Sequence, residues 1–280
     1  MALDSMKEIF DQMERENIPF WEVVLQADME ERQVTRKQSM AKMLITWQAM
    51  EDAADTYTGT RKSVSGLVGG DGIKMRQYAM RGAAMSGGYV CDVIAEALSM
   101  AESNACMRRI VAAPTAGACG VLPAVLLPLC NYEELTQHQL LEALYVASGI
   151  GAVIAHRACI SGAAGGCQAE IGTAAAMAAG ALVAIKGGTG AQIGHAVAMA
   201  LKNLMGLICD PVAGLVEVPC VKRNVIGAVD AVSAADMALA GVESRIPVDE
   251  TPWATWAGAC LWNSGRQPWA ALPRRLPVRR

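Results

Sequence analysis

The feature that most limits the possible folds is a set of glycine-rich segments that separate long apolar runs. These segments cover residues 59–72, 113–120 and 161–166. The runs between them show no series of short strands joined by regular turns, and no internal repeat is visible. Dense glycine marks loops, and glycine lets backbone amides approach a ligand closely. The pattern predicts a compact all-α fold with glycine-rich loops between buried helices.

Helical spacing is clearest where Met40, Leu44 and Trp47 follow one another on one face. Pro19 suits the first turn of a helix, so one helix is predicted from there to about residue 58. Further helices are expected over residues 3–16, 74–84, 88–102, 121–130, 137–160, 167–185, 191–206 and 221–242.

Composition narrows the class of protein. Hydrophobic residues make up 53% of the chain, which excludes an intrinsically disordered chain. The net charge of −3 provides no basic surface for nucleic acid, and aromatic residues, at 5%, are too few for a base-stacking surface. Abundant Ala, Gly, Met and Leu favour packed helices over a β-sandwich.

One stretch raises the question of a membrane span. Residues 110–132 carry no formal charge and are long enough to cross a bilayer, but they contain three prolines and much alanine. We interpret them as a buried loop followed by a helix, and the uncharged runs 171–185 and 191–201 are too short to span. Residues 1–11 lack the basic and then apolar pattern of a signal peptide. The expectation is a cytoplasmic protein without a membrane partner.

Nine cysteines without a secretion signal indicate a reducing compartment. Cys167 lies at a predicted helix start, where the helix dipole lowers the pKa of a thiol, and Cys209 and Cys220 bracket a loop constrained by proline and glycine. Two interpretations stay open. The three residues form a soft metal site, or they are buried structural cysteines, which spacing alone favours because no C-x-x-C pair occurs.

Other titratable residues are few. His138 is predicted at the surface, whereas His156 and His195 are either hydrogen-bonded core histidines or acid–base groups. Lys186 precedes Gly-Gly-Thr-Gly, a weak indication of a pyridoxal phosphate lysine.

Four motifs together resemble a known family, the alpha chain of iron–sulfur-dependent L-serine dehydratase. They read SGLVGGDG at 65–72, IVAAPTAGACGVLP at 110–123, GGCQAEIG at 165–172 and LKNLMGLICDPVAGLVEVPCVKRN at 201–224. The resemblance covers about residues 5–250. It implies an all-helical catalytic domain with its glycine-rich loops around a metal-cluster site, an ammonia-lyase that converts L-serine into pyruvate and ammonia, and a separate beta-type partner chain.

The resemblance also implies site residues. A [4Fe–4S] cluster is expected on Cys167, Cys209 and Cys220, which leaves one iron free to act as a Lewis acid on the serine hydroxyl. Loop amides and hydroxyls around Ser65, Gly66 and Thr115 are expected to hold the substrate carboxylate. His156 and His195 are candidates for the base that takes the Cα proton, unless the partner chain supplies it.

Other classes of protein stay open as alternatives: a pyridoxal phosphate lyase, an iron–sulfur cysteine desulfidase, and a helical membrane or scaffold protein.

The end of the chain differs from the rest. At residue 251 the sequence becomes rich in Trp, Arg and Pro, like a translation in a shifted reading frame or a naturally divergent tail. We therefore expect a helical domain over 1–250 and a poorly packed segment over 251–280.

Overall fold

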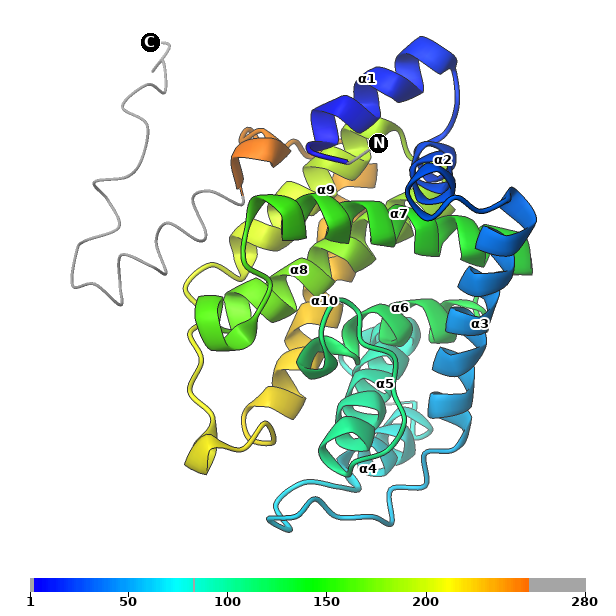
Figure 1. Ribbon diagram of the computed structural model, residues 1–280. Helices are drawn as coiled ribbons and strands as arrows, with labels where there is room; N and C mark the ends of the chain where they lie inside the picture. The colour runs from blue at the N-terminus through cyan, green and yellow to red at the C-terminus, as the bar shows by residue number, and fades with distance from the viewer. Residues whose placement is uncertain (1–2, 83, 252–280) are drawn as a thin grey trace, which may run out of the picture.

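The computed structural model describes residues 3–82 and 84–251, and every regular element within them is a helix (Figure 1). The prediction of an all-α fold is therefore confirmed for this part of the chain. The α-helices are α1 (Met6–Glu16), α2 (Phe20–Arg32), α3 (Arg36–Asp55), α4 (Asp71–Ala79), α5 (Gly87–Ala105), α6 (Val121–Leu129), α7 (Gln137–Arg157), α8 (Gly162–Ile185), α9 (Gly190–Asn203) and α10 (Cys220–Leu239), with short 3₁₀ turns η1 (Ala116–Ala118), η2 (Val212–Gly214) and η3 (Val248–Glu250).

Helix α8 forms the centre of the fold, and α7, α9 and α10 pack around it (Figure 1). Its buried face consists largely of alanine and glycine, which lets the neighbouring helices come close. A Cβ added at Gly180 would overlap Cδ1 of Ile150 on α7, and one at Gly151 would lie 2.9 Å from Sδ of Met177. The missing side chains are what allow α7 and α8 to approach this closely.

The second group of helices contains α4, α5 and α6, and α3 runs along its side (Figure 1). Helix α5 packs against α4, α6 and α10, so α10 contacts both groups. The loops that precede α4, α6 and α10 therefore approach the same region of the molecule.

The single helix predicted from Pro19 to about residue 58 is wrong, because the chain breaks between α2 and α3. Gln33 adopts a left-handed conformation with φ 53° and ends α2. Thr35 then begins α3 with a capping box, in which Thr35 and Gln38 each bond the backbone of the other. The remaining predicted helices are present, with boundaries shifted by a few residues. The loop predicted over residues 161–166 is wrong, because Gly162 already begins α8 and only Gly166 departs from helical geometry.

The two ends of the described region meet at Asp249. Its carboxylate accepts hydrogen bonds from the backbone N–H groups of Met6 and Lys7, both at 2.9 Å, and pairs with Arg157 at 3.0 Å. Thr251, the first residue of the predicted tail, is fully buried. The rest of that tail lies outside the described residues, so the boundary at 250 stays a prediction.

Two helices in the described region, α7 and α8, have the length and apolar composition of a membrane span. In α7 and α8, 67% and 83% of the most apolar window is buried inside the protein, as in the core helices of a helical domain. The loop-then-helix interpretation of residues 110–132 is confirmed, because a coil and η1 lead into α6.

Candidate metal centre

Cys167 lies at a kink of α8 that glycine makes possible. Gly166 has φ 76° and ψ −178°, values that other residues rarely adopt, and a Cβ there would lie 3.3 Å from the backbone nitrogen of Cys209. The backbone N–H of Gln168 donates to the carbonyl of Leu207 at 2.8 Å. The kink therefore joins the start of α8 to the segment that carries Cys209.

The other two candidate ligands bound the connection between α9 and α10. Cys209 is exposed, whereas Cys220 is partly buried and is the first residue of α10. Burial raises the pKa of the Cys220 thiol to about 11, and the nearby Cys167 and Cys209 thiols add to the shift. The three cysteines thus lie within each other's electrostatic influence, although Cys167 and Cys220 are 53 positions apart in the sequence.

Arg223 links these segments. Its Nη1 donates to Sγ of Cys167 at 3.0 Å and to the carbonyl of Ile208 at 2.8 Å, and its Nη2 pairs with Asp210 at 2.5 Å. A planar guanidinium suits this bridging task because its donors point in fixed directions. Arg223 thus fixes α10, the kink of α8 and the Cys209 segment to one another.

The expected low pKa of Cys167 is wrong for the free thiol. Burial raises the pKa of Cys167, and the hydrogen bond and positive charge of Arg223 offset the shift only in part. Cys167 is only 4% exposed, and this burial raises its pKa more than a position near a helix start lowers it. A soft metal can still displace the thiol proton, because metal binding itself deprotonates the ligand.

The three candidate ligands are all thiols. Among the described residues, no group of three or more His, Cys, Asp or Glu side chains lies close enough to hold one metal ion. The thiols of Cys167 and Cys209 lie near enough to Cys220 to raise its pKa, and soft thiolates are the ligands that iron–sulfur clusters prefer.

Thr115 lies beside the candidate centre. Its hydroxyl donates to the carboxylate of Glu170, one turn after Cys167 on α8, and a Cβ at Gly117 would lie 2.7 Å from that carboxylate. Asn224 on α10 accepts from the N–H of Gly120 at 2.9 Å and donates to the carbonyl of Gly117 at 2.8 Å. The loop 113–120 is therefore held by the same two helices that carry Cys167 and Cys220.

Ser65 and Gly66 belong to a loop that reaches the connection between Cys209 and Cys220. The hydroxyl of Ser63 donates to Glu217 at 2.6 Å, and the hydroxyl of Ser65 donates to the same carboxylate oxygen. The structure thus brings the loops of Ser65 and Thr115 towards the cysteines through Glu217 and through Glu170 and Asn224.

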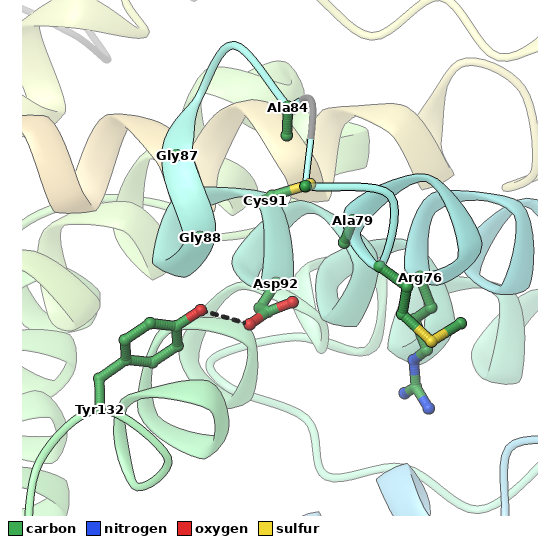
Figure 2. Close-up of a pocket in the computed structure, with 10 residues that line it drawn as sticks. Arg76, Ala79, Ala84, Gly87, Gly88, Cys91, Asp92 and Tyr132 are labelled. Carbon is green, nitrogen blue, oxygen red and sulfur yellow. Dashed lines mark hydrogen bonds between the residues drawn. The ribbon is translucent and has the colours of Figure 1, made fainter.

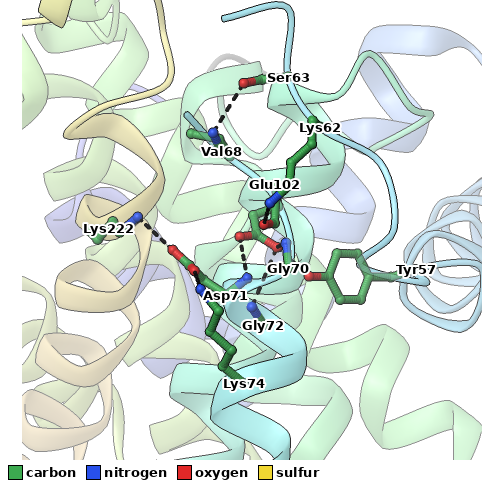
Figure 3. A network of polar contacts seen from close by, with 11 residues as sticks. Tyr57, Lys62, Ser63, Val68, Gly70, Asp71, Gly72, Lys74, Glu102 and Lys222 are labelled. Carbon is green, nitrogen blue, oxygen red and sulfur yellow. Dashed lines mark hydrogen bonds and ion pairs between the residues drawn. The ribbon is translucent and has the colours of Figure 1, made fainter. Parts of the chain in front are cut away.

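Glu102 on α5 holds the end of the loop at residues 59–72, and its side chain is buried, with the residue only 1% exposed (Figure 3). Glu102 accepts from the backbone N–H groups of Gly70, Asp71 and Gly72 at 3.0, 2.8 and 3.4 Å. The Tyr57 hydroxyl also donates to it, and burial together with this bond raises the pKa of Tyr57. These bonds attach the end of the loop and the start of α4 to Glu102 on α5.

The structure does not bring the candidate histidines into contact with the cysteines. His156 ends α7 beside Asp4, 3.4 Å away, and its side chain is 59% exposed. His195 lies in the second turn of α9, next to Gly194, which faces Phe10. His138, 3.3 Å from Glu142, lies at the surface as expected. A catalytic role for His156 or His195 stays a prediction.

Two cavities occur elsewhere. One of about 340 Å³ lies between α4 and α5, where Tyr132 donates to Asp92 at 2.7 Å (Figure 2). A wider groove of about 920 Å³ follows α3 and α5 and is lined by several acidic side chains. Neither contains a predicted site residue.

Lys186 forms an ion pair with Glu133, which accounts for its position without pyridoxal phosphate.

Sequence reasoning missed Glu170, Asn224, Glu217 and Arg223. Glu170 had a signal, since it is the only charged residue within α8, a helix that is otherwise apolar or small. The other three lie inside the longest motif but look unremarkable there. Their role depends on the partners that the fold provides, which no spacing rule predicts.

Comparison with known proteins adds independent information. The serine dehydratase alpha chain family matches residues 15–259. The probable L-serine dehydratase alpha chain of Bacillus subtilis (strain 168) is 44% identical over 246 residues, which span 88% of this chain and 82% of that protein. The L-serine dehydratase alpha chain of Peptoniphilus asaccharolyticus is 39% identical over 250 residues, covering 89% and 85%. L-serine dehydratase 2 of Escherichia coli (strain K12) is 47% identical over 156 residues, covering 55% of this chain and 34% of that protein.

Proposed function

This chain belongs to the serine dehydratase alpha chain family, and from that premise we propose that it eliminates water from L-serine to give pyruvate and ammonia. Such an enzyme is an ammonia-lyase. The elimination removes the Cα proton and the β-hydroxyl as water, and the resulting enamine tautomerises and is hydrolysed to the two products. The observation that supports this site most strongly is the bridge that Arg223 makes between Cys167 and the Cys209 segment.

We propose that Cys167, Cys209 and Cys220 hold a [4Fe–4S] cluster. When bound through three thiolates, such a cluster supplies an iron without a protein ligand, which acts as a Lewis acid on the substrate hydroxyl. Arg223 keeps the three segments together, and Gly166 gives α8 the bend that points Cys167 towards them.

The remaining chemistry falls to hydrogen-bond donors and a base. Ser65 and Gly66, on an exposed stretch of loop, and Thr115, beside Glu170, are proposed to bind and orient the substrate carboxylate. A base must then take the Cα proton, with His156 and His195 as candidates on this chain. His156 is exposed and lies beside Asp4, and we propose that the partner chain supplies the base.

A beta-type partner chain completes the proposal. The relatives from Bacillus and Peptoniphilus are named alpha chains, and this chain spans 34% of the L-serine dehydratase 2 of Escherichia coli. We propose that the remaining part of the active site comes from a separate chain and that the assembly works in the cytoplasm, without nucleic acid or membrane.

Cysteine substitution tests the ligand assignment. Replacing Cys167, Cys209 or Cys220 singly by serine should reduce bound iron from about four atoms per chain to less than one, because a hard hydroxyl replaces a soft thiolate. Iron analysis and the visible absorption of anaerobic protein measure this directly, and serine turnover should fall with it. Cys130→Ser is the matched control, since Cys130 is exposed and follows the last residue of α6.

The same spectrum separates the competing classes. A broad brown absorbance supports an iron–sulfur enzyme, a discrete pyridoxal band would indicate the other lyase class, and no absorbance would favour a scaffold. L-serine and L-cysteine as substrates then distinguish a dehydratase from a desulfidase. Full iron content and turnover in Cys209→Ser would contradict the assignment.

A further inference from the structure

The connection between Cys209 and Cys220 has an inverted pattern of exposure. Its apolar residues Val212, Leu215 and Val216 are 51%, 39% and 54% exposed, whereas Glu217, its only charged residue after Asp210, is 6% exposed. Burying a carboxylate costs free energy unless hydrogen bonds replace its water. The chain therefore turns this side chain inward for a specific set of partners.

Those partners are two serine hydroxyls on the loop that precedes α4. Ser63 Oγ donates to Oε2 of Glu217 at 2.6 Å, and Ser65 Oγ donates to the same oxygen. The two hydroxyl oxygens accept from backbone N–H groups in turn, Ser63 from Val68 at 3.2 Å and Ser65 from Leu67 at 3.1 Å. With their oxygens oriented in this way, the hydroxyl hydrogens point at Glu217.

This loop is thus organised as a receptor for one carboxylate, and Glu217 occupies it. Hydrogen bonds from Ser63 and Ser65 hold the pKa of Glu217 below its usual range, so the group is ionised at neutral pH. A serine hydroxyl has one hydrogen to donate. The hydrogen of Ser65 cannot serve Glu217 and the carboxylate of a bound amino acid at the same time.

We propose that Glu217 is an internal competitor for the substrate carboxylate and thereby sets the affinity of the enzyme for L-serine. The proposal rests on the assignment of Ser65 and Gly66 as the carboxylate-binding residues. A substrate must displace the Glu217 side chain from Ser65 before it receives that hydrogen bond.

Three features make the displacement feasible. Ser65 and Gly66 are exposed, so a small molecule reaches them from solvent. Substrate and Glu217 both offer a carboxylate, so one set of donors serves either in turn. The connection that carries Glu217 is irregular apart from η2, whereas the receiving loop is anchored by Glu102 at its base. The Glu217 segment is therefore more easily displaced than the loop that carries Ser63 and Ser65.

The test uses the complete enzyme, loaded with its cluster and assembled with the partner chain. Glu217→Gln removes the charge, and a neutral amide competes less well for the hydroxyls. The Michaelis constant for L-serine should fall about tenfold, and equilibrium binding of L-serine to the anaerobic chain should tighten by a similar factor. Glu243→Gln is the control: Glu243 is exposed and pairs with Arg245 at 2.8 Å, so the KM of this variant should not change.

Ser65→Ala separates the possible failures. If it raises KM while Glu217→Gln leaves KM unchanged or raises it, the competitor role is wrong and the carboxylate site stands. If Ser65→Ala leaves KM unchanged, the carboxylate site is misplaced and both assignments fall. If Glu217→Gln does not fold, Glu217→Asp retains the charge on a shorter arm and should lower KM less; an unchanged or raised KM would overturn the proposal.

Discussion

Asp230 shows how one buried atom affects the stability of the fold. Its Oδ1 accepts from Asn203 at 2.6 Å across the packing of α10 on α9, while its Oδ2 is buried and has no hydrogen-bond partner among the described residues. Burial raises the pKa of Asp230 from 3.8 to about 6. Because the folded protein binds this proton more tightly than the unfolded chain, the free energy of unfolding falls as the pH rises from about 4 to about 6.

Asp230→Asn should therefore stabilise the protein above that window. At pH 7.5 we expect a gain of about 1–2 kcal/mol in the free energy of unfolding, because the substitution removes a buried charge. The gain should shrink as the pH falls towards 4, where Asp230 becomes neutral. Urea denaturation at both pH values measures this, with the exposed Asp236→Asn on the same helix as the control. An equal gain at both pH values would contradict the argument.

At the residue scale, the sequence motifs name candidate residues but do not indicate which residues these contact. The cysteine assignment came from the motifs around Cys167, Cys209 and Cys220, since their spacing alone left buried cysteines as an open interpretation. Arg223, on α10, and Glu217, in the connection before it, were missed because the identity of a single charged residue in a motif does not indicate its partner. What each contacts depends on how α8, α10 and the loop at 59–72 meet in space.

At the scale of elements, α7 and α8 pack closely where Gly180 faces Ile150. Replacing an interior helical glycine by alanine usually stabilises a helix by up to about 1 kcal/mol. At Gly180 the added Cβ would overlap Ile150 Cδ1, so the cost of overpacking should exceed that gain. Gly172, in the same helix, has its nearest such neighbour, Cβ of Leu204, at 3.9 Å.

We expect Gly180→Ala to lower the free energy of unfolding by about 1–2 kcal/mol, and Gly172→Ala to leave it unchanged or raise it slightly. Chemical denaturation of both variants under the same conditions provides the comparison. Equal effects of the two substitutions would show that helix propensity, rather than space between α7 and α8, controls both positions.

The helices could be predicted because long apolar runs have a clear helical period. The boundary between α2 and α3 was not predicted. The break between α2 and α3 had a local signal, since Thr35 is followed three residues later by Gln38. The same Thr-x-x-Gln pattern begins α7 at Thr136 and α9 at Thr189, and all three form capping boxes. Apolar spacing continues across such a break, so periodicity alone hides it.

For the molecule as a whole, Asp249 joins the two ends of the described region. It caps the first two amides of α1 and pairs with Arg157, whose side chain is 22% exposed. Asp249→Ala should lower the free energy of unfolding by about 1–3 kcal/mol, since a helix cap and a half-buried ion pair are lost together. Denaturation measures the loss, and amide exchange should show it concentrated in α1.

Asp11→Ala provides the matched control, because Asp11 also pairs with a residue of α1, Lys7, but at the surface with a 53% exposed side chain. A loss for Asp249→Ala no larger than that for Asp11→Ala would mean that η3 does not hold α1 in place.

The alanine and glycine face of α8 also sets the direction in which mutation can change this protein. No residue is smaller than glycine, and glycine is the only residue smaller than alanine. Almost every random replacement on that face therefore adds atoms where Ala175, Ala178 and Ala181 are already completely enclosed. A core with side chains this small cannot accept larger residues unless a facing helix loses volume at the same time. We therefore expect substitutions in α8 to occur together with compensating substitutions in α7, α9 or α10.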